Sequence, residues 1–340
     1  MRVGVIGCGT IAYWAHLRTL RSLAGATLVA AADPDPAARE RAARLAGVPV
    51  HESASALLGR ADVDAVVVSA PTAHHAELAV AAAEAGKHLY LEKPLATNAA
   101  DACRAADAIR RAGIVAAIGF NFRHHPAHQR ARALLAEGHI GAVRAVQTVF
   151  CEPTPIERMP PWKRRRDSGG GALLDLASHH VDLLRWLLAD EVESVQARIE
   201  AAHSEGDTAA LDLRMRGGVD VQSYVSFCAG PVDCFELVGE RGSLRVDRHS
   251  LMPRLRKARG SRYGLRSHRS MPDASTAAAW IRRVVRPSYD PSYRRALEAF
   301  VGQVQGRSTQ VATIDDGERS LAVVLAAEES ARCQRVVRMP

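Results

Sequence analysis

A glycine-rich turn near the start of the chain has the residue types and spacing of a dinucleotide-binding turn. The segment Gly7-Cys8-Gly9-Thr10-Ile11-Ala12 follows a short apolar run and opens a helical pattern. Gly7 permits a tight turn, Gly9 lets the backbone approach a pyrophosphate, and Ala12 allows close packing of helix on strand. Amides at the helix N-terminus would donate hydrogen bonds to the phosphates. We therefore expect the cofactor to contact Gly7, Gly9, Thr10, Ile11 and Ala12.

A carboxylate at the end of the next apolar run indicates which nicotinamide cofactor this turn would bind. Asp33 directly follows the run Thr27–Ala32. A carboxylate at this place hydrogen-bonds the hydroxyls of the adenosine ribose and repels a 2′-phosphate. The sequence therefore predicts NAD as the cofactor, with NADP less favoured.

Three ionisable residues in the second half of the chain have the spacing of neighbours on one helix face. Asp175, His179 and Asp182 stand at i, i+4 and i+7. A histidine there has a pKa suited to taking a hydroxyl proton near neutral pH; the plainer alternative is a satisfied interior histidine. A metal site is a third reading, here or at the histidines between 124 and 128. The Glu of an H-E-x-x-H motif is missing, so we predict no metal.

The elements that must position these residues follow two patterns along the chain. Up to about residue 120, short apolar runs alternate with Ala-rich helical stretches, which is typical of a parallel sheet buried on both faces. The predicted strands are Val3–Ile6, Thr27–Ala32, Ala65–Ser69, His88–Leu91 and Val115–Gly119; the predicted helices include Pro36–Ala46, Ala76–Ala85 and one that Asn98 caps and that runs to Arg111. Residues 1–120 are therefore predicted to form an α/β Rossmann domain.

The rest of the chain, residues 121–340, is predicted to form an α+β domain. A helical segment, Gly171–Leu188, precedes runs that alternate with a period of two and have tight Gly-containing connections, which favours an antiparallel or mixed sheet with one less buried face. These runs are Glu193–Ala201, Ala209–Met215, Val219–Phe227, Val232–Val238 and Ser243–Val246, and the helices Pro291–Gln305 and Asp316–Arg332 follow.

Two predicted strands of the first domain end in further candidate cofactor contacts. Ala65–Ser69 leads into Pro71, Thr72 and His75, and His88–Leu91 leads into Glu92 and Lys93. Ligands of open parallel sheets bind at the carboxyl edge of the strands. We expect all five residues to contact the cofactor; the alternative for the first three is that they only form a turn and cap a helix.

Composition narrows the class of protein. The chain has 340 residues, 47% of them hydrophobic, and a formal net charge of +8. The window 254–295 holds twelve basic and two acidic residues, a net charge of +10, so all other residues together carry −2. We expect this window to be an irregular excursion that is either a solvated surface or oligomer interface, or a lid that gathers an anionic substrate. No nucleic-acid module is recognisable, and aromatic residues are few, so nucleic-acid binding is not expected.

The remaining composition favours a cytoplasmic protein. Six cysteines are scattered without a CxxC pair, as expected for reduced thiols. No stretch approaches the roughly 20 apolar residues that a membrane span requires.

Taken together, the motifs resemble those of the glucose–fructose oxidoreductase / inositol dehydrogenase / rhizopine-catabolism (Gfo/Idh/MocA) family. The residues that carry the resemblance are Gly7–Ala12, the Ala-Gly-Lys-His of 85–88, Glu92-Lys93-Pro94, and Gly169-Gly170-Gly171 followed by Asp175-x-x-x-His179-x-x-Asp182. The resemblance spans essentially the whole chain. It implies a Rossmann domain followed by a domain with a large open, mostly antiparallel sheet that commonly forms homodimers or homotetramers.

The resemblance also implies the activity and its residues. It implies NAD(P)-dependent hydride transfer between nicotinamide and a secondary alcohol or ketone of a sugar, aminosugar, cyclitol or nucleotide sugar. Such chemistry needs a base for the hydroxyl proton and a cation beside the developing alkoxide. The family's catalytic positions fall on Lys93, Asp175 and His179, with His179 as base, Lys93 as cation, and Asp175 holding a neighbouring hydroxyl or orienting the histidine.

Three more residues are expected at the substrate. Arg123 follows the last Rossmann strand, where the family lines its substrate pocket; an ion pair between the domains is the alternative. Trp162 directly precedes the basic run 163–166, and Arg166 ends it. This run either recognises a phosphate or carboxylate of the substrate or is a solvated loop.

Two other functions remain open on the sequence alone. One is a cofactor-binding regulator that keeps the fold without catalysis. The other is a dehydrogenase of a non-sugar substrate, such as an aromatic diol or a pyrrole pigment. Retention of Lys93, Asp175 and His179 favours an enzyme with a hydroxyl-rich substrate.

Overall fold

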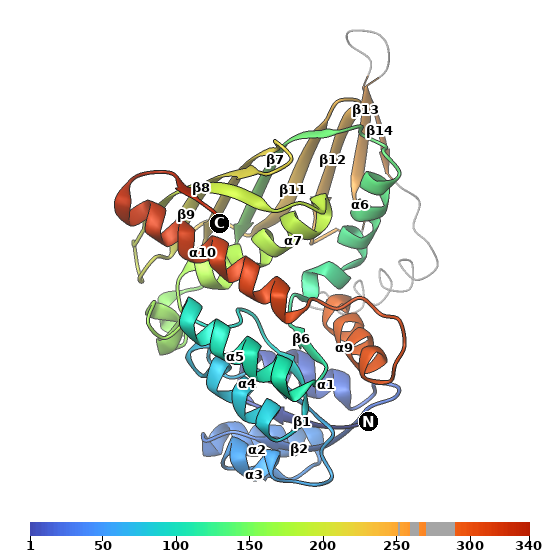
Figure 1. The fold of residues 1–340 in the computed structure, drawn as a ribbon, viewed down its shortest axis with the longest axis vertical. Coiled ribbons are helices and arrows are strands. Elements are labelled where there is room, and N and C mark those ends of the chain that lie inside the picture. The colour runs from blue at the N-terminus through green and yellow to red at the C-terminus, as the bar shows by residue number, and fades with distance from the viewer. Residues whose placement is uncertain (251, 259–264, 270–289) are drawn as a thin grey trace. The chain divides into compact units, whose positions relative to one another are not determined.

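The chain divides into two compact units. The computed structural model describes residues 1–250, 252–258, 265–269 and 290–340 (Figure 1). The first unit comprises Met1–Asn121, Asp167–Gly169 and Tyr293–Leu321; the second comprises Phe122–Arg166, Gly170–Ser292 and Ala322–Pro340. The first unit therefore takes up a stretch near the C-terminus that lies far beyond residue 120.

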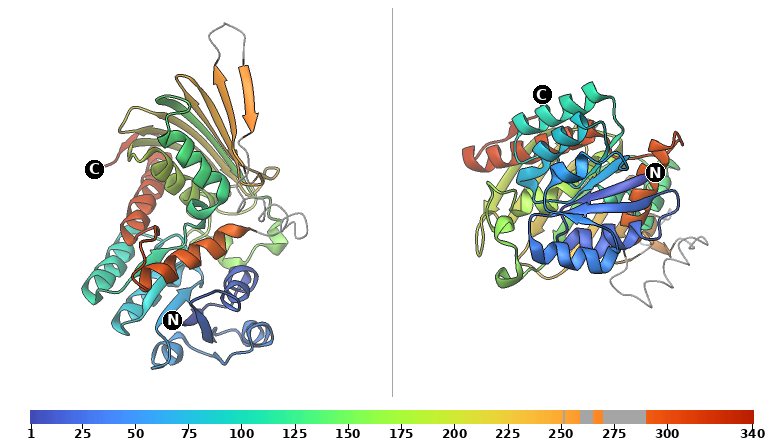
Figure 2. Two further views of the ribbon diagram at one scale, coloured as in Figure 1. Left: turned by 90° about the vertical axis from the view of Figure 1, so that its right-hand side faces the viewer. Right: turned by 90° about the horizontal axis from the view of Figure 1, so that it is seen from below.

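The first unit is built on a six-stranded parallel sheet with helices on both faces (Figure 2). The strand order is β3-β2-β1-β4-β5-β6, so the direction of winding reverses between β1 and β4. The strands are β1 (Arg2–Ile6), β2 (Thr27–Ala32), β3 (Val50–His51), β4 (Ala65–Val68), β5 (His88–Leu91) and β6 (Ala116–Ile118). The helices are the π-helix η1 (Ala12–His16), α1 (Leu17–Leu20), α2 (Pro36–Ala46), α3 (Ala54–Leu58), η2 (Thr72–His74), α4 (His75–Glu84), α5 (Ala99–Ala112), α9 (Pro291–Val304) and the first part of α10 (Ile314–Cys333).

Local signals determine where these elements begin and end. All four residues of β4 are buried, as a central strand covered on both faces requires. Asp35 caps α2 by accepting hydrogen bonds from two backbone amides of the first turn, and Gly47 ends the helix in the left-handed region. Asn98 caps α5 through the amide of Asp101, as predicted. Helix α9 completes the apolar core, where Leu297 and Phe300 pack with the strands.

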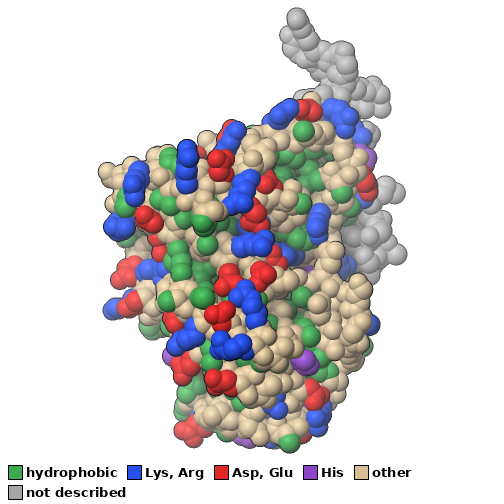
Figure 3. Space-filling model, viewed as in Figure 1, with side chains coloured by type: hydrophobic (Ala, Val, Ile, Leu, Met, Phe, Trp, Pro, Cys, Tyr) green, Lys and Arg blue, Asp and Glu red, His purple; other side chains and the backbone are tan. Residues whose placement is uncertain are grey.

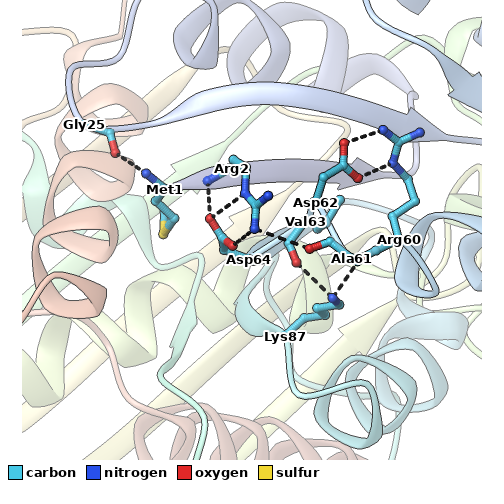
Figure 4. A network of polar contacts seen from close by, with 9 residues as sticks. All are labelled: Met1, Arg2, Gly25, Arg60, Ala61, Asp62, Val63, Asp64 and Lys87. Carbon is cyan, nitrogen blue, oxygen red and sulfur yellow. Dashed lines mark hydrogen bonds and ion pairs between the residues drawn. The ribbon is translucent and has the colours of Figure 1, made fainter.

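A polar network joins the amino-terminal ends of the strands in the first unit (Figure 4). The guanidinium of Arg2 donates to Asp64, with a shortest N–O distance of 2.7 Å, and Lys87 Nζ donates to the carbonyls of Arg60 and Val63, both at 2.9 Å. Lys87 belongs to the Ala-Gly-Lys-His motif of the sequence, and its contacts tie chain segments together at the edge opposite the glycine turn. The motif lysine is therefore structural.

The second unit is built on a nine-stranded sheet of order β14-β13-β12-β11-β7-β10-β9-β8-β15. Neighbouring strands are antiparallel except β7 and β10, which run parallel. The strands are β7 (Val143–Cys151), β8 (Val192–Glu200), β9 (Thr208–Met215), β10 (Asp220–Ser226), β11 (Val232–Gly239), β12 (Gly242–Asp247), β13 (Arg254–Ala258), β14 (Leu265–Arg269) and β15 (Val337–Arg338). The helices are η3 (Asn121–His124), α6 (Pro126–Ala136), η4 (Ile156–Arg158), η5 (Pro161–Arg164), the π-helix η6 (Leu173–Ala177), α7 (Ser178–Leu188) and the second part of α10.

One face of this sheet is covered and the other is more exposed. Burial alternates along β9 and β10, and Figure 2 shows α6 and α7 on one face. Exposed apolar side chains on the second face include Tyr224 and Val238. The fold thus confirms the predicted Rossmann sheet and the large, mostly antiparallel sheet.

Several elements differ from the expectation. Helix α6 and the central strand β7 were not predicted; the histidines and arginines of α6 obscure its apolar stripe. The predicted helix Gly171–Leu188 begins later, because Gly171 lies in the left-handed region and the first turn is π-helical. Part of the window 254–295 is regular: it contains β13, β14 and the start of α9, whereas residues 259–264 and 270–289 lie outside the described residues.

The basic residues of the window 254–295 are likewise not confined to an irregular segment. Arg254 and Arg256 are exposed on β13, which pairs with β12 on one side and with the edge strand β14 on the other. On the face drawn in Figure 3, basic and acidic side chains of the described residues are interspersed. None of the helices in the described ranges is long and apolar enough to cross a membrane.

Candidate active site

The glycine turn lies where the strand order of the first sheet reverses. Gly7 has a φ of +86°, and a Cβ added there would lie 2.6 Å from the backbone nitrogen of Ala70, just beyond β4. The hydroxyl of Ser69 donates to the carbonyl of Gly7 at 2.9 Å. A reversal of strand order at the carboxyl edge of a sheet is where such folds bind ligands.

The space around Gly9 suits a bound phosphate. A Cβ added at Gly9 would meet nothing within 4 Å, and Gly9 and Thr10 are exposed. Ala12 is fully buried where η1 begins, so the helix packs closely on the sheet. The chain thus leaves an open approach to backbone amides at a helix N-terminus, which fits the pyrophosphate of NAD.

The carboxylate of Asp33 is held beside this turn. Its Oδ2 accepts a hydrogen bond from the amide of Cys8 at 2.6 Å, and its Oδ1 accepts one from the amide of Asp35 at 2.8 Å. Burial, helped by the charge of Asp33, raises the pKa of the Cys8 thiol to about 12, so that thiol stays protonated. The fixed carboxylate has the place predicted for a ribose-binding group.

Two buried side chains hold the segment that carries Lys93. His75 Nδ1 lies 2.6 Å from the carbonyl oxygen of Pro94, and its Nε2 lies 2.9 Å from that of Ala70. The Lys93–Pro94 peptide bond is cis. Glu92 Oε1 lies 2.8 Å from Nε2 of the fully buried His16. The side chains of His75 and Glu92 therefore contact other groups of the protein, and these contacts hold the backbone on either side of Lys93.

In the second unit, Asp175 lies in the π-helix η6 and contacts a lysine. Lys163 Nζ donates to Asp175 Oδ2 at 2.6 Å and lies 5.5 Å from the ring centroid of Trp162. Burial opposes the charge on Lys163, but the carboxylate of Asp175 outweighs it and raises the pKa of the lysine. A Cβ added at Gly170 would lie 2.2 Å from the carbonyl oxygen of Lys163, so this glycine allows the close approach that places the lysine.

The prediction that Asp175, His179 and Asp182 share one regular helix face needs correction. Each hydrogen bond of a π-helical turn spans five residues, so Asp175 does not follow the spacing of 3.6 residues per turn. Within α7, the imidazole of His179 stacks on Phe122 with ring centroids 4.1 Å apart and planes 12° apart. Asp182 accepts from Arg123 Nε at 2.7 Å.

The arginines expected at the substrate are engaged within the second unit. Arg123 forms a buried ion pair with Asp182 inside that unit. Arg166 pairs with Glu328 through both sides of its guanidinium. Lys163, in the same basic run, contacts Asp175 through its side chain.

Two family models match the chain. A model of an oxidoreductase family with an NAD-binding Rossmann fold matches residues 1–120, and one of the GFO/IDH/MocA C-terminal domain matches residues 128–245. A dTDP-3,4-didehydro-2,6-dideoxy-alpha-D-glucose 3-reductase from Streptomyces violaceoruber is 32% identical over 91% of this chain and 90% of its own length. The chain belongs to the GFO/IDH/MocA oxidoreductase family.

Other members of the GFO/IDH/MocA family cover the same length. Inositol 2-dehydrogenase 2 from Saccharopolyspora erythraea is 32% identical over 95% of this chain and 91% of its own. The crystal structure of the WlbA dehydrogenase from Chromobacterium violaceum, in complex with NADH and UDP-GlcNAcA, superposes with a TM-score of 0.83 at 27% identity, covering 100% of this chain and 96% of that one. The predicted family, oxidoreductase class and NAD cofactor are confirmed.

Sequence reasoning missed two side chains in this GFO/IDH/MocA oxidoreductase. Lys163 was noticed only as part of a basic run, and nothing local distinguishes it from Arg164, whose guanidinium binds backbone carbonyls. Phe122 was missed because its partner, His179, lies 57 positions later. Among the described residues, no group of three His, Cys, Asp or Glu side chains is arranged to hold a metal ion.

A buried carboxylate supports the start of η6 in this family member, and it makes stability depend on pH. Asp207 is fully buried and accepts hydrogen bonds from the amides of Ala202, His203 and Ser204, while the carbonyl of the adjacent Gly206 accepts from Ala172. Burial opposes ionisation, but the three backbone donors outweigh it and lower the pKa of Asp207.

We expect acid to destabilise the protein partly through this residue. A carboxyl whose pKa is lower in the folded state stabilises the protein above its unfolded pKa of about 3.9, and that stabilisation is lost as the pH falls below it. Asp207→Asn should lower the free energy of unfolding at pH 7 by about 1–3 kcal/mol. It should also flatten the fall in stability between about pH 5 and 3.

Urea unfolding over a pH series measures both effects. The matched control is Asp212→Asn, which changes an exposed carboxylate on β9 and should leave the curve unchanged. Equal pH dependence in wild type and Asp207→Asn would contradict the assignment.

Proposed function

We propose that this protein transfers a hydride between NAD and a secondary alcohol or ketone carbon of a hydroxyl-rich small molecule. The observation that carries the redox part is the open glycine turn at the strand-order reversal with the carboxylate of Asp33 fixed beside it. The relatives named above as a deoxysugar reductase and an inositol dehydrogenase support a sugar, aminosugar, cyclitol or nucleotide sugar as substrate class.

The proposed roles follow from the surroundings of each side chain. Bound NAD supplies the hydride acceptor or, in the reduced form, the donor. The ammonium of Lys93 stabilises the alkoxide that forms as the C–H bond breaks, and the imidazole of His179 takes the hydroxyl proton. Asp175, paired with Lys163, accepts a hydrogen bond from a neighbouring hydroxyl.

The remaining predicted residues receive supporting roles. We propose that residues 1–120 bind the cofactor and residues 121–340 the substrate. Trp162, half-buried beside Lys163, offers an apolar surface to a sugar ring. Arg123 and Arg166 hold α7 and the basic loop through Asp182 and Glu328.

A substrate screen tests the proposed function. The purified protein is incubated with NAD and a panel of free sugars, aminosugars, cyclitols and nucleotide sugars, and with NADH and the corresponding ketones, while nicotinamide absorbance is followed. We expect saturable turnover with at least one class. Tight NADH binding without turnover on any compound, aromatic diols included, would instead favour a non-catalytic cofactor-binding protein.

Asp33 should control the choice between NAD and NADP. Asp33→Ser removes the negative charge that repels a 2′-phosphate, so the preference for NAD should fall by about 10- to 100-fold, or about 1.4–2.8 kcal/mol. The ratio of kcat/KM values for the two cofactors measures it. Asp35→Ser, which alters the cap of α2, is the control; an unchanged ratio in Asp33→Ser would contradict this role.

We further propose that the protein is cytoplasmic and forms a homodimer or homotetramer through the exposed face of the nine-stranded sheet. All six cysteines are free thiols, as in a reducing compartment. The exposed side chains of Tyr224, Val232 and Val238, which the strand register puts on this one face of the sheet, give a partner copy apolar surface to cover.

A further inference from the structure

Two consecutive histidines of α7 are each stacked on a phenylalanine. His179 stacks on Phe122, and His180 stacks on Phe150 with ring centroids 5.1 Å apart and planes 18° apart. The two phenylalanine rings lie 5.8 Å apart. All four side chains are buried. The proposed reaction uses only His179, so the other three need a different explanation.

A buried aspartate and an arginine connect the two stacked pairs. His180 Nε2 lies 3.1 Å from Asp233 Oδ1, and Arg248 Nε donates to Asp233 Oδ2 at 2.5 Å. The guanidinium carbon of Arg248 then lies 4.6 Å from the ring centroid of Phe122 and 5.7 Å from that of Phe150. These contacts form a closed circuit of side chains that begins and ends on α7; its members, in order, are His180, Asp233, Arg248, Phe122 and His179.

Further contacts hold Arg248 within this circuit. Its second nitrogen donates to Asp290 Oδ2 at 3.2 Å, and the amide of Ser292 donates to Asp290 Oδ1. Asp233 is 1% exposed; burial opposes its ionisation, but His180 and Arg248 outweigh it and hold its pKa below its usual range. Burial also opposes the ionisation of Asp290, but the neighbouring His125 and Arg248 outweigh it and lower the pKa of that carboxyl. With a carboxylate on two sides, the guanidinium has few alternative positions.

Burying these charged groups costs free energy of hydration, so stability alone does not explain the arrangement. Two carboxylates and a guanidinium lose much of their hydration here, and well-packed apolar side chains commonly stabilise such a region as well or better. Buried ion pairs do select one geometry over others. A guanidinium over an aromatic face also gains cation–π attraction, which restricts the tilt of the ring.

We propose that Arg248 is a positioning residue for His179. Held by Asp233 and Asp290, its guanidinium fixes the ring of Phe122, and that ring fixes the plane of the stacked imidazole. The imidazole is thereby held in one orientation for taking the hydroxyl proton. This inference rests on the proposed role of His179.

Steady-state kinetics of Arg248 variants test the inference. Arg248→Met removes the charge and the planar fork, and it should lower kcat by about 10- to 100-fold, because small errors in the placement of a catalytic group cost this much. KM and the Kd for NADH should change less than about two-fold, because the substitution removes no group that binds the substrate or the cofactor in the ground state. Arg248→Lys, which keeps a cation for the carboxylates, should recover part of kcat.

A double-mutant cycle separates positioning from a general structural role. In a His179→Ala background, Arg248→Met should have almost no further effect on the residual kcat, because the group it positions is gone. Arg245→Met, which alters an exposed arginine on β12, is the matched control and should leave kcat unchanged in both backgrounds. An equal loss from Arg248→Met in both backgrounds overturns the inference.

Two further outcomes are distinguishable. If Arg248→Met fails to fold, Phe122→Leu takes its place as the test variant, because it leaves the ion pairs of Arg248 intact. Phe122→Leu should lower kcat as much as Arg248→Met. In the His179→Ala background it should have almost no further effect on kcat. Unchanged kcat in Phe122→Leu overturns the inference. Wild-type turnover in His179→Ala itself would refute the proposed role of His179, whereas no turnover of any substrate by the wild type would refute the proposed function.

Discussion

Lys93→Met should lower kcat/KM by about 1,000-fold, or about 4 kcal/mol, while NADH still binds, and we expect the same of His179→Ala. Loss of a positioned acid–base group typically costs 100- to 10,000-fold, and loss of a cation at a developing alkoxide costs a similar amount. Steady-state rates on the substrate found in the screen, with NADH binding followed by fluorescence, measure both quantities. The segment that carries Lys93 is held by His75 and Glu92, so truncating its side chain leaves the backbone contacts in place.

Lys87→Met is the matched control for Lys93→Met. The ammonium of Lys87 binds two backbone carbonyls at the opposite edge of the sheet, so its loss should lower thermal stability and leave kcat unchanged (Figure 4). His139→Ala, on a half-buried histidine paired with Glu137, serves the same purpose for His179. Turnover within a few-fold of wild type in both Lys93→Met and His179→Ala would contradict the proposed chemistry.

Substitution of the two turn glycines separates cofactor binding from folding. Gly9→Val should raise the Kd for NADH by about 100-fold or more, or about 3 kcal/mol, because its side chain occupies the open space where a pyrophosphate would approach. Its melting temperature should hardly change, since a Cβ at Gly9 meets no protein atom within 4 Å. Calorimetric titration with NADH and thermal melting measure the two effects.

Gly7→Ala, in contrast to Gly9→Val, should mainly lower the stability of the protein. Its Cβ would lie 2.6 Å from the nitrogen of Ala70 and would stand on a backbone with φ of +86°, so stability should fall by roughly 1–3 kcal/mol or more. The turn would then lose NADH affinity as a consequence of distortion. Wild-type NADH affinity in Gly9→Val would show that the cofactor does not lie over this turn.

Local signals were enough to predict five of the six strands of the first sheet; the two-residue edge strand β3 was not predicted. Strand His88–Leu91 and helix Pro36–Ala46 have the predicted bounds, because a continuous apolar run and a helix with Asp35 and Gly47 at its ends depend little on distant residues. The glycine turn and Asp33 were predicted for the same reason. Both stand within a few residues of the strands that place them.

Contacts between distant parts of the chain could not be predicted. Nothing local to α7 indicates that Asp233 and Arg248 close a circuit around its histidines, since they lie on other elements more than 50 residues away. The π-helical turn at Asp175 depends on the left-handed Gly171 and on Gly206 of another loop. Strand β7 is central only because β10 and β11 pair with it.

Isotopic labelling follows the transferred hydride itself. A substrate from the screen, deuterated at the carbinol carbon, is oxidised with NAD, and the reduced nicotinamide is examined by mass spectrometry. We expect one deuterium in each NADH formed, and we expect Lys93→Met and His179→Ala to lose most of the rate of transfer. Formation of NADH without deuterium, or no NADH from any hydroxyl-rich compound despite tight cofactor binding, would contradict it.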